Sequence, residues 1–245
     1  MRRKSISVAA LTVITSSLVV AASAQASYHE NLIREVHEGG VSGDYVELQA
    51  YAGGQNLVSG KHIVSYDAGG GSPLTDFPIP SNVANGANQA TILIASTATV
   101  GGVTADFNAG VNLNVDNTGG TVCFTDSSIT VKLDCVAFDG TGGAAVTVPS
   151  GANFGTPFAL PGVNLDGQSL IRTISRGCAT ALDTADDTNS AADFSLGAGS
   201  PRNNSATPTE TPCPSTPAKK KCKKHKKKSG AYSAKKKKCK KKKHH

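Results

Sequence analysis

The hydrophobic pattern along the chain has a dominant period of two, which predicts β-strands. Residues 111–115 alternate strictly between apolar and polar side chains, and residues 44–49 place Val46 and Leu48 on one face. Residues 131–137 alternate in the same way. Because successive side chains of a strand point to opposite faces, these segments are typical of strands with one face in a core.

Other segments extend this prediction to most of the chain. Residues 90–95 form a continuous run of apolar and β-branched residues, which is typical of a strand buried on both faces. Further strands are expected at residues 32–36, 63–66, 103–107 and 170–174. Glycine pairs and triplets separate these segments and provide the positive φ angles that turns require. Many short strands without intervening helices predict an all-β sandwich or barrel, and the one place for a helical turn is 179–192.

Composition excludes helical architectures. The chain has 26 Gly, no Trp and one Met among 245 residues, and 5% of its residues are aromatic. A helical bundle or coiled coil requires Ala, Leu, Glu and Lys at a period near 3.6, and residues 27–218 lack that pattern.

The N-terminal residues 1–26 have the features of a secretory signal peptide. Basic residues at positions 2–4 precede an apolar stretch over 8–22, and Ala24-Gln25-Ala26 is a small-x-small cleavage site. The apolar stretch is shorter than the ~20 residues that a transmembrane helix needs. We therefore expect a secreted or extracellular protein, which the cell surface can retain, with no transmembrane span in its mature form.

Charge is strongly segregated along the chain. Residues 27–218 contain six basic residues against all 18 acidic residues, a net charge of −12. The C-terminal segment has no acidic residue and 16 lysines: Lys219, Lys220, Lys221, Lys223, Lys224, Lys226, Lys227, Lys228, Lys235, Lys236, Lys237, Lys238, Lys240, Lys241, Lys242 and Lys243. Such a run of like charges predicts a tail that is disordered when free. We expect a sandwich domain at 27–199, a semi-rigid Pro/Thr/Ser-rich linker at 200–217 and a Lys-rich tail at 218–245.

Six cysteines in an exported chain indicate disulfides. Cys123 and Cys135 flank two short strands joined by a polar turn, which would bring their sulfurs together. Cys178 and Cys213 are candidates to fix the end of the folded region, and two more cysteines lie in the tail. Six cysteines allow many connectivities, and the sequence alone does not choose among them.

Motifs near both ends of the folded region resemble those of the lamin-tail domain family. Leu-Ile-Arg-Glu-Val at 32–36, Asp-Tyr-Val-Glu-Leu at 44–48 and Leu-Val-Ser-Gly at 57–60 are similar to the family's opening. The family's ending resembles three features of this sequence: a strand that carries Arg172, the pair Asp193-Phe194, and Ser-Pro-Arg-Asn at 200–203. Lys61-His62 stands where the family usually has a Trp. The resemblance implies an immunoglobulin-like β-sandwich that serves as a binding or structural module and has no catalytic residues.

Candidate metal ligands are few. His29 and His37 lie near glutamates, but no metal-binding spacing is present, and we expect solvated surface residues there. The densest set of oxygen donors, a weak candidate for a calcium site, consists of Asp183, Asp186, Asp187 and Asn189. These residue types are equally common as loop and helix-cap residues. No cofactor is expected.

The sequence does not indicate an enzyme. It has no Gly-x-Ser-x-Gly motif and no phosphate-binding loop of the Gly-x-x-x-x-Gly-Lys type. The tail is the strongest functional signal, because clustered lysines bind polyanions by displacing condensed counterions. We expect a non-enzymatic module held by its tail at an anionic cell-envelope polymer or another extracellular polyanion. The alternatives are nucleic-acid binding through the tail, a tail that docks on the acidic body, and an accessory module or cryptic secreted hydrolase. The oligomeric state is left open.

Overall fold

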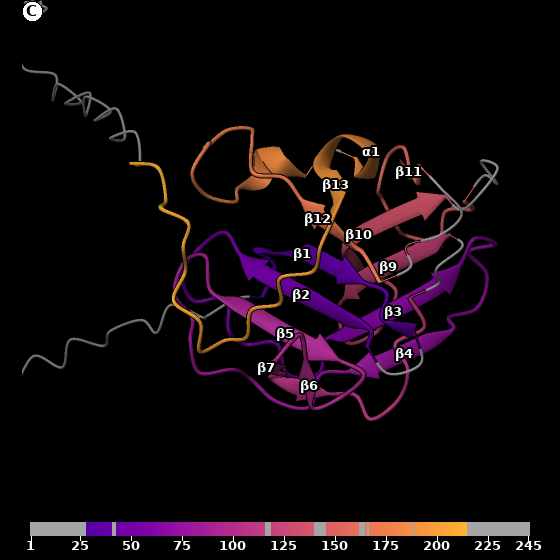
Figure 1. Cartoon of the computed structure of the whole chain (residues 1–245), viewed down its shortest axis with the longest axis horizontal. Coiled ribbons are helices and arrows are strands. Elements are labelled where there is room, and N and C mark those ends of the chain that lie inside the picture. Colours follow the sequence, from indigo (N-terminus) through magenta and orange to yellow (C-terminus); the bar gives the residue numbers. More distant parts are fainter. Residues whose placement is uncertain are drawn as a thin grey trace, which may run out of the picture. The chain divides into compact units, whose positions relative to one another are not determined.

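The described part of the chain consists mainly of β-strands arranged in two sheets (Figure 1). The structure is a computed structural model and describes residues 28–40, 43–115, 119–139, 146–161, 165, 167–187 and 189–214. One sheet has six strands in the order β13 (Phe194–Gly197), β12 (Ser169–Arg172), β1 (Asn31–His37), β2 (Tyr45–Ala50), β5 (Thr91–Ala95) and β8 (Phe107–Asn108). The other has five strands in the order β11 (Phe158–Ala159), β10 (Lys132–Asp139), β9 (Gly120–Thr125), β3 (His62–Asp67) and β4 (Thr75–Pro78).

Neighbouring strands are antiparallel except at one end of each sheet, where β8 pairs with β5 and β11 pairs with β10 in parallel. A small hairpin of β6 (Thr99–Val100) and β7 (Val103–Thr104) follows β5. The predicted all-β sandwich is therefore the observed architecture.

The main core lies between the two sheets, where apolar side chains from both meet. The six-stranded sheet contributes Val46 and Leu48 from β2, and the five-stranded sheet contributes Phe124 and Phe138. Each of these four side chains is completely buried. The period-two pattern of the sequence therefore identifies the face of each strand that packs into this core.

The outer faces of both sheets are partly covered as well. On the six-stranded sheet, Tyr45, Leu93, Ala95 and Val100 form a separate buried cluster. All five residues of β5 are buried: Ile92 and Ile94 enter the main core, Leu93 and Ala95 enter this outer cluster, and the Thr91 hydroxyl donates to the Asn203 carbonyl of the chain's C-terminal part. The predicted double burial of this strand is thus observed.

The outer face of the five-stranded sheet carries a disulfide between Cys123 of β9 and Cys135 of β10, one of the pairs that the sequence suggested. The two residues are direct partners in the antiparallel ladder, with Cα atoms 4.1 Å apart. Phe154 and Val146 cover the pair from outside the sheet. The disulfide is therefore inside an apolar cluster and not on the surface.

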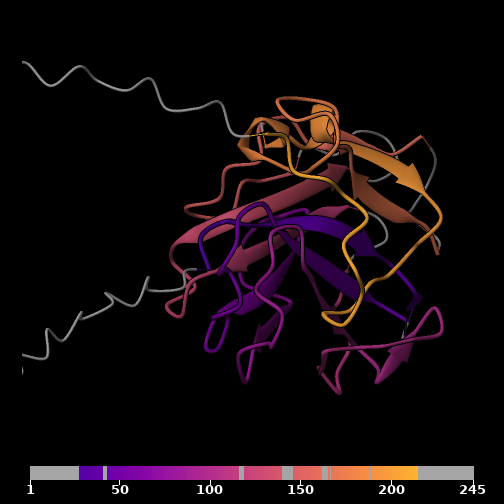
Figure 2. The ribbon, with the colours of Figure 1, turned by 90° about the vertical axis from the view of Figure 1, so that its left-hand side faces the viewer.

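The segment between β12 and β13 contains two short helical turns, within the predicted range 179–192 and one residue beyond it. A 3₁₀ turn at Thr184–Asp186 and α1 (Ser190–Asp193) lie together at one end of the sandwich in both views (Figures 1 and 2). Within the described ranges, no helix has the length and apolar character to cross a bilayer.

The strand predicted at 103–107 is divided between β7 and β8, which belong to different sheets, and the strand predicted at 111–115 is wrong. Residues 111–115 alternate like a strand, and Leu113 and Val115 are buried, but the segment pairs with no strand. Side chains take the place of a neighbouring strand: Ser65 donates a 2.7 Å hydrogen bond to the Leu113 carbonyl, and Asp44 accepts from the Val115 amide at 3.1 Å. The alternation here indicates which side chains are buried. It does not indicate hydrogen bonding to a neighbouring strand.

A buried ion pair connects the two sheets. The guanidinium of Arg172 on β12 lies 2.6 Å from Asp134 Oδ2 on β10, and both side chains are 1% exposed. Arg172 Nε also donates to the carbonyl of Ile33, whose amide donates to the same Asp134 oxygen at 2.6 Å. The guanidinium lies 4.6 Å from the ring centroid of Phe194. Three strands from two sheets therefore meet at one charge pair.

We predict that Arg172→Met lowers the free energy of unfolding by about 3–5 kcal/mol, because it leaves the buried Asp134 carboxylate without its cation. Asp134→Leu should cost less, because Arg172 keeps its contacts to Asp187 and Asp193. The double variant should lose clearly less than the sum of the two, since the Arg172–Asp134 pair is then removed as a whole. Denaturant unfolding measures all three. Asp76→Asn, in an exposed pair with His62, is the control and should cost at most about 1 kcal/mol. Additive losses in the double variant would contradict the prediction.

Candidate functional site

The residues expected to bind polyanions lie outside the described part of the chain. This holds for all sixteen tail lysines and for residues 1–26. The structure therefore bears on the tail only through the segment that leads to it, residues 199–213, here called the strap.

The strap, which covers most of the range expected as a linker (200–217), belongs to the same compact unit as the sandwich. Its orange-to-yellow trace runs from β13 across β1, β2 and β5 (Figure 1). The Arg202 amide donates to Glu47 Oε2 at 2.6 Å, and Arg202 Nε and Nη2 donate to Oε1 at 3.1 and 2.9 Å. The Arg202 guanidinium also binds Glu210, within the strap itself, at 2.9 Å. The Pro/Thr/Ser-rich composition suggested a linker, but Glu47 on β2 provides a buried partner for the strap.

Asn204 attaches the middle of the strap. Its side chain donates to the carbonyls of Asn85 and Thr91 at 3.1 and 2.9 Å and accepts from the Asn85 amide at 2.7 Å. Its own amide donates to Asp106 Oδ2 at 2.8 Å. Asn204 is 6% exposed, so these bonds replace water almost completely.

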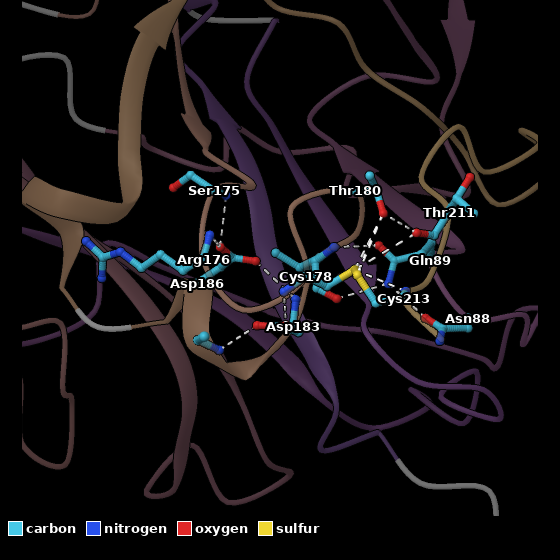
Figure 3. Close-up of a disulfide and its surroundings, with 12 residues drawn as sticks. Asn88, Gln89, Ser175, Arg176, Cys178, Thr180, Asp183, Asp186, Thr211 and Cys213 are labelled. Carbon is cyan, nitrogen blue, oxygen red and sulfur yellow. Dashed lines mark hydrogen bonds between the residues drawn. A yellow bond between two sulfur atoms is a disulfide. The ribbon is translucent and has the colours of Figure 1, made fainter. Parts of the chain in front are cut away.

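A disulfide between Cys178 and Cys213, the other suggested pair, closes the strap (Figure 3). Next to it, the Thr211 amide donates to the Thr180 carbonyl at 2.9 Å, and the Thr180 hydroxyl donates to the Thr211 carbonyl at 2.6 Å. Cys213 is exposed, and only Pro214 follows it in the described range. The chain is therefore covalently attached to the domain six residues before the first tail lysine, Lys219.

The acidic loop does not assemble a metal site. Asp183 Oδ1 accepts from the Ala185 amide and Oδ2 from the Cys178 amide, each at 2.7 Å, so this carboxylate caps the 3₁₀ turn and fixes the cysteine (Figure 3). Asp186 accepts from the amides of Ser175 and Arg176.

The other two candidates of this loop have structural partners too. Asp187 lies 3.4 Å from Arg172, and Asn189 caps α1 by accepting from the Ala192 amide at 2.9 Å. In the part of the chain that the structure describes, no three His, Cys, Asp or Glu side chains form a cluster suited to a metal ion. The loop's oxygen atoms are bonded to the backbone and to Arg172.

His37 is not the solvated surface residue expected from the sequence, whereas His29 is exposed. His37 Nδ1 lies 2.9 Å from the Ser169 hydroxyl, and its ring stacks on Tyr45 with centroids 4.7 Å apart. Burial lowers the pKa of His37. The position of β12 beside β1 brings the serine to the histidine, because His37 and Ser169 are direct partners in the ladder.

This group does not have the exposure that nucleophilic catalysis needs. Ser169 has no exposed surface, and the Tyr45 hydroxyl donates to the buried carboxylate of Glu35. Gly199 of the strap covers all of them: a Cβ at that position would collide with the Tyr45 hydroxyl and press on Ser169 and His37. A hollow of about 470 Å³ beside His37 and Tyr45 therefore has an oriented imidazole at its edge but no accessible serine.

Many of the acidic residues are not surface charges. Glu35, Glu38, Asp44, Glu47, Asp134, Asp186 and Asp193 are all buried. The net charge of −12 therefore overstates the negative field of the folded surface, which weakens the hypothesis of a tail docked on its own body. Sequence reasoning missed this role for the acids; an isolated Glu47 in the apolar strand was the available signal.

No protein-family model matches the sequence, and no significant match is found among curated proteins.

The Cys178–Cys213 disulfide should determine whether the strap stays attached. Replacing both cysteines by serine removes a cross-link across 35 residues of sequence and should lower the free energy of unfolding by about 3–4 kcal/mol. The end of the strap should also open locally, so trypsin should cleave after Arg202 faster than in the unaltered protein. Denaturant unfolding and limited proteolysis measure the two effects. Unchanged cleavage at Arg202 would mean that the Glu47 and Asn204 contacts hold the strap alone.

Glu47 and Glu210 share Arg202 but should affect pH dependence in opposite directions. Burial raises the pKa of Glu47 to about 7, against the opposing effect of Arg202. Burial acts in the same direction on Glu210, but hydrogen bonds from Gln49 and Arg202 lower its pKa overall. A raised pKa in the folded state means that stability from Glu47 is greatest below its ordinary pKa of 4.5 and falls as pH rises through about 7.

The unaltered protein should lose unfolding free energy as pH rises from about 4.5 to about 7. We therefore predict that this loss is absent in Glu47→Gln. Glu210→Gln, the matched variant, should remove stability that is present above pH 4.5 and lost as pH falls through the lowered pKa. Denaturant unfolding across this pH range gives both slopes. Slopes that change in the same direction in the two variants would contradict the assignment.

Proposed function

We propose that the protein is an exported, non-enzymatic binding or structural module held at a surface polyanion by its Lys-rich tail. One observation carries the proposal: the chain is cross-linked to the domain at Cys213, immediately before a segment with 16 lysines and no acidic residue. A cationic segment attached at a fixed covalent point is suited to tethering a domain. The two disulfides are in keeping with an oxidising, extracellular environment.

The basic residues of the body support the assignment of polyanion binding to the tail. Arg172 and Arg202 are used in ion pairs inside the domain. Lys132 donates to the Tyr66 hydroxyl at 2.7 Å, and Lys61 lies 3.8 Å from the ring centroid of Tyr28. With these cations engaged in the fold, the tail is the concentrated source of positive charge.

The contacts of the motif residues support a lamin-tail-like, immunoglobulin-like identity for the sandwich. Arg202, from the motif that ends the resemblance, binds Glu47 of the Asp-Tyr-Val-Glu-Leu motif near its start. Arg172 lies against the ring of Phe194, within the closing motif. Residues that the resemblance selects from distant parts of the sequence are thus partners in the fold, as a shared architecture requires. Such a module recognises a partner and performs no reaction.

The experiment compares three forms of the full chain: the natural tail, all sixteen tail lysines replaced by glutamine, and all sixteen replaced by arginine. Retention on isolated cell envelopes and on double-stranded DNA is measured across a salt series. The natural and arginine tails should bind envelopes at low salt and dissociate as salt rises, because both carry the same charge. The glutamine tail should not bind.

Equal retention of the glutamine variant would contradict the anchor. Tail-dependent retention on DNA but not on envelopes would instead favour the alternative of nucleic-acid binding. Turnover of an ester or glycoside substrate by the purified protein, lost in none of the tail variants, would point to the alternative of a secreted hydrolase.

A further inference from the structure

A polar cleft of about 550 Å³ lies beside the strap. Loop 81–85 forms one wall, Asn204 and Ser205 of the strap form another, and Asp106 and Phe107 at the start of β8 complete it. This volume is in the range of small-molecule sites. None of the described residues that line the cleft belongs to the His37 group.

Hydrogen bonds hold the walls of the cleft in place. Asn85 and Asn204 exchange three bonds: Asn85 donates from its amide and from Nδ2, and Asn204 Nδ2 donates back to the Asn85 carbonyl. Asp106 Oδ2 accepts from the amides of Leu93 and Asn204, both at 2.8 Å. A ligand would therefore meet a preformed site and would not have to order a loop.

The same bonds leave specific polar atoms unused. Asp106 Oδ1 accepts no hydrogen bond from any other described residue, because both bonds to this carboxylate go to Oδ2. Asn82 Oδ1 accepts from the Ser59 amide at 2.9 Å, which leaves its Nδ2 as a donor. The Ser81 hydroxyl has no partner among the described residues and can act both ways. The cleft thus offers a fixed acceptor, a fixed donor and a hydroxyl.

We propose that this cleft binds a neutral saccharide through its hydroxyls. Each sugar hydroxyl both donates and accepts, so one can donate to Asp106 Oδ1 while another accepts from Asn82 Nδ2. Val83 and Ala84 provide apolar surface for the C–H groups of the sugar ring, beside the largely buried Phe107.

The lining excludes other ligand classes. No basic side chain is among the described residues of the cleft, and the Asp106 carboxylate repels an anion. A single carboxylate does not make a site for a metal ion. An ammonium ligand finds no second negative charge there, whereas the free amide donor of Asn82 suits an oxygen acceptor.

The test uses the full chain and four probes: the methyl glycosides of glucose, mannose and galactose, and N-acetylglucosamine. Amide chemical shifts of residues 81–85 and 204–205 are followed during each titration by NMR. Asp106→Asn keeps an oxygen for the Leu93 and Asn204 amides but places a donor where the free acceptor was. Asn82→Asp keeps an oxygen that accepts from the Ser59 amide, but it replaces the free Nδ2 donor by an acceptor.

We expect saturable shifts in these residues with at least one probe, and binding weakened about tenfold or more in each of the two variants. Asp67→Asn is the control: it makes the same charge change at an exposed turn, where its oxygen bonds the Gly70 amide, and should leave binding unchanged. Thermal unfolding verifies that each variant is folded.

High salt and the glutamine tail should leave saccharide binding unchanged, so the cleft and the tail anchor can fail independently. The proposal is overturned if none of the four probes shifts the cleft residues. It is also overturned if Asp106→Asn and Asn82→Asp bind as the unaltered protein does, or if tetramethylammonium shifts the cleft residues and the saccharides do not.

Discussion

The arrangement of the two sheets and of the loop beside them depends on the contacts of the Arg172 guanidinium. It joins β12 to β10 through Asp134 and to β1 through the Ile33 carbonyl. It also donates to the Asp186 carbonyl at 3.0 Å, which fixes the loop between β12 and β13. Removing a guanidinium from water costs several kcal/mol, and close bonds to fixed acceptors offset that cost. The pair thus specifies one arrangement of sheets and loop.

The position of the end of the strap follows from that loop. Asp186 accepts from the Asp183 amide at 3.1 Å, and Asp183 in turn accepts from the Cys178 amide. These bonds fix the position of Cys178, which forms the disulfide with Cys213 (Figure 3). A continuous series of bonds leads from the centre of the sandwich to the last described residues of the strap.

The sequence predicted the sandwich because its core is local in pattern: residues such as Val46 and Leu48 alternate along one strand. It did not predict the strap, because a Pro-rich segment contains no periodic signal and its partner, Glu47, is 155 residues away. Residues 111–115 were misassigned for a related reason. Burial produces alternation, but only a neighbouring strand produces a ladder, and here Ser65 and Asp44 side chains occupy that place. The polar cleft was equally hidden, since loop 81–85, Asp106 and Asn204 meet only in the folded chain.

The buried acids change what the charge of the chain means. A formal −12 in the body and sixteen lysines in the tail suggest two opposite poles that attract each other. In the fold, many of those acids accept backbone amides: Asp44 from Gly39, Asp106 from Leu93, Asp134 from Ile33. A carboxylate used in this way supports irregular backbone and is not offered to a lysine tail. Many of the acidic residues thus stabilise the loops and the strap of a sandwich that has few aromatic residues. The tail's charge is correspondingly less compensated by its own domain, which favours a partner outside the molecule.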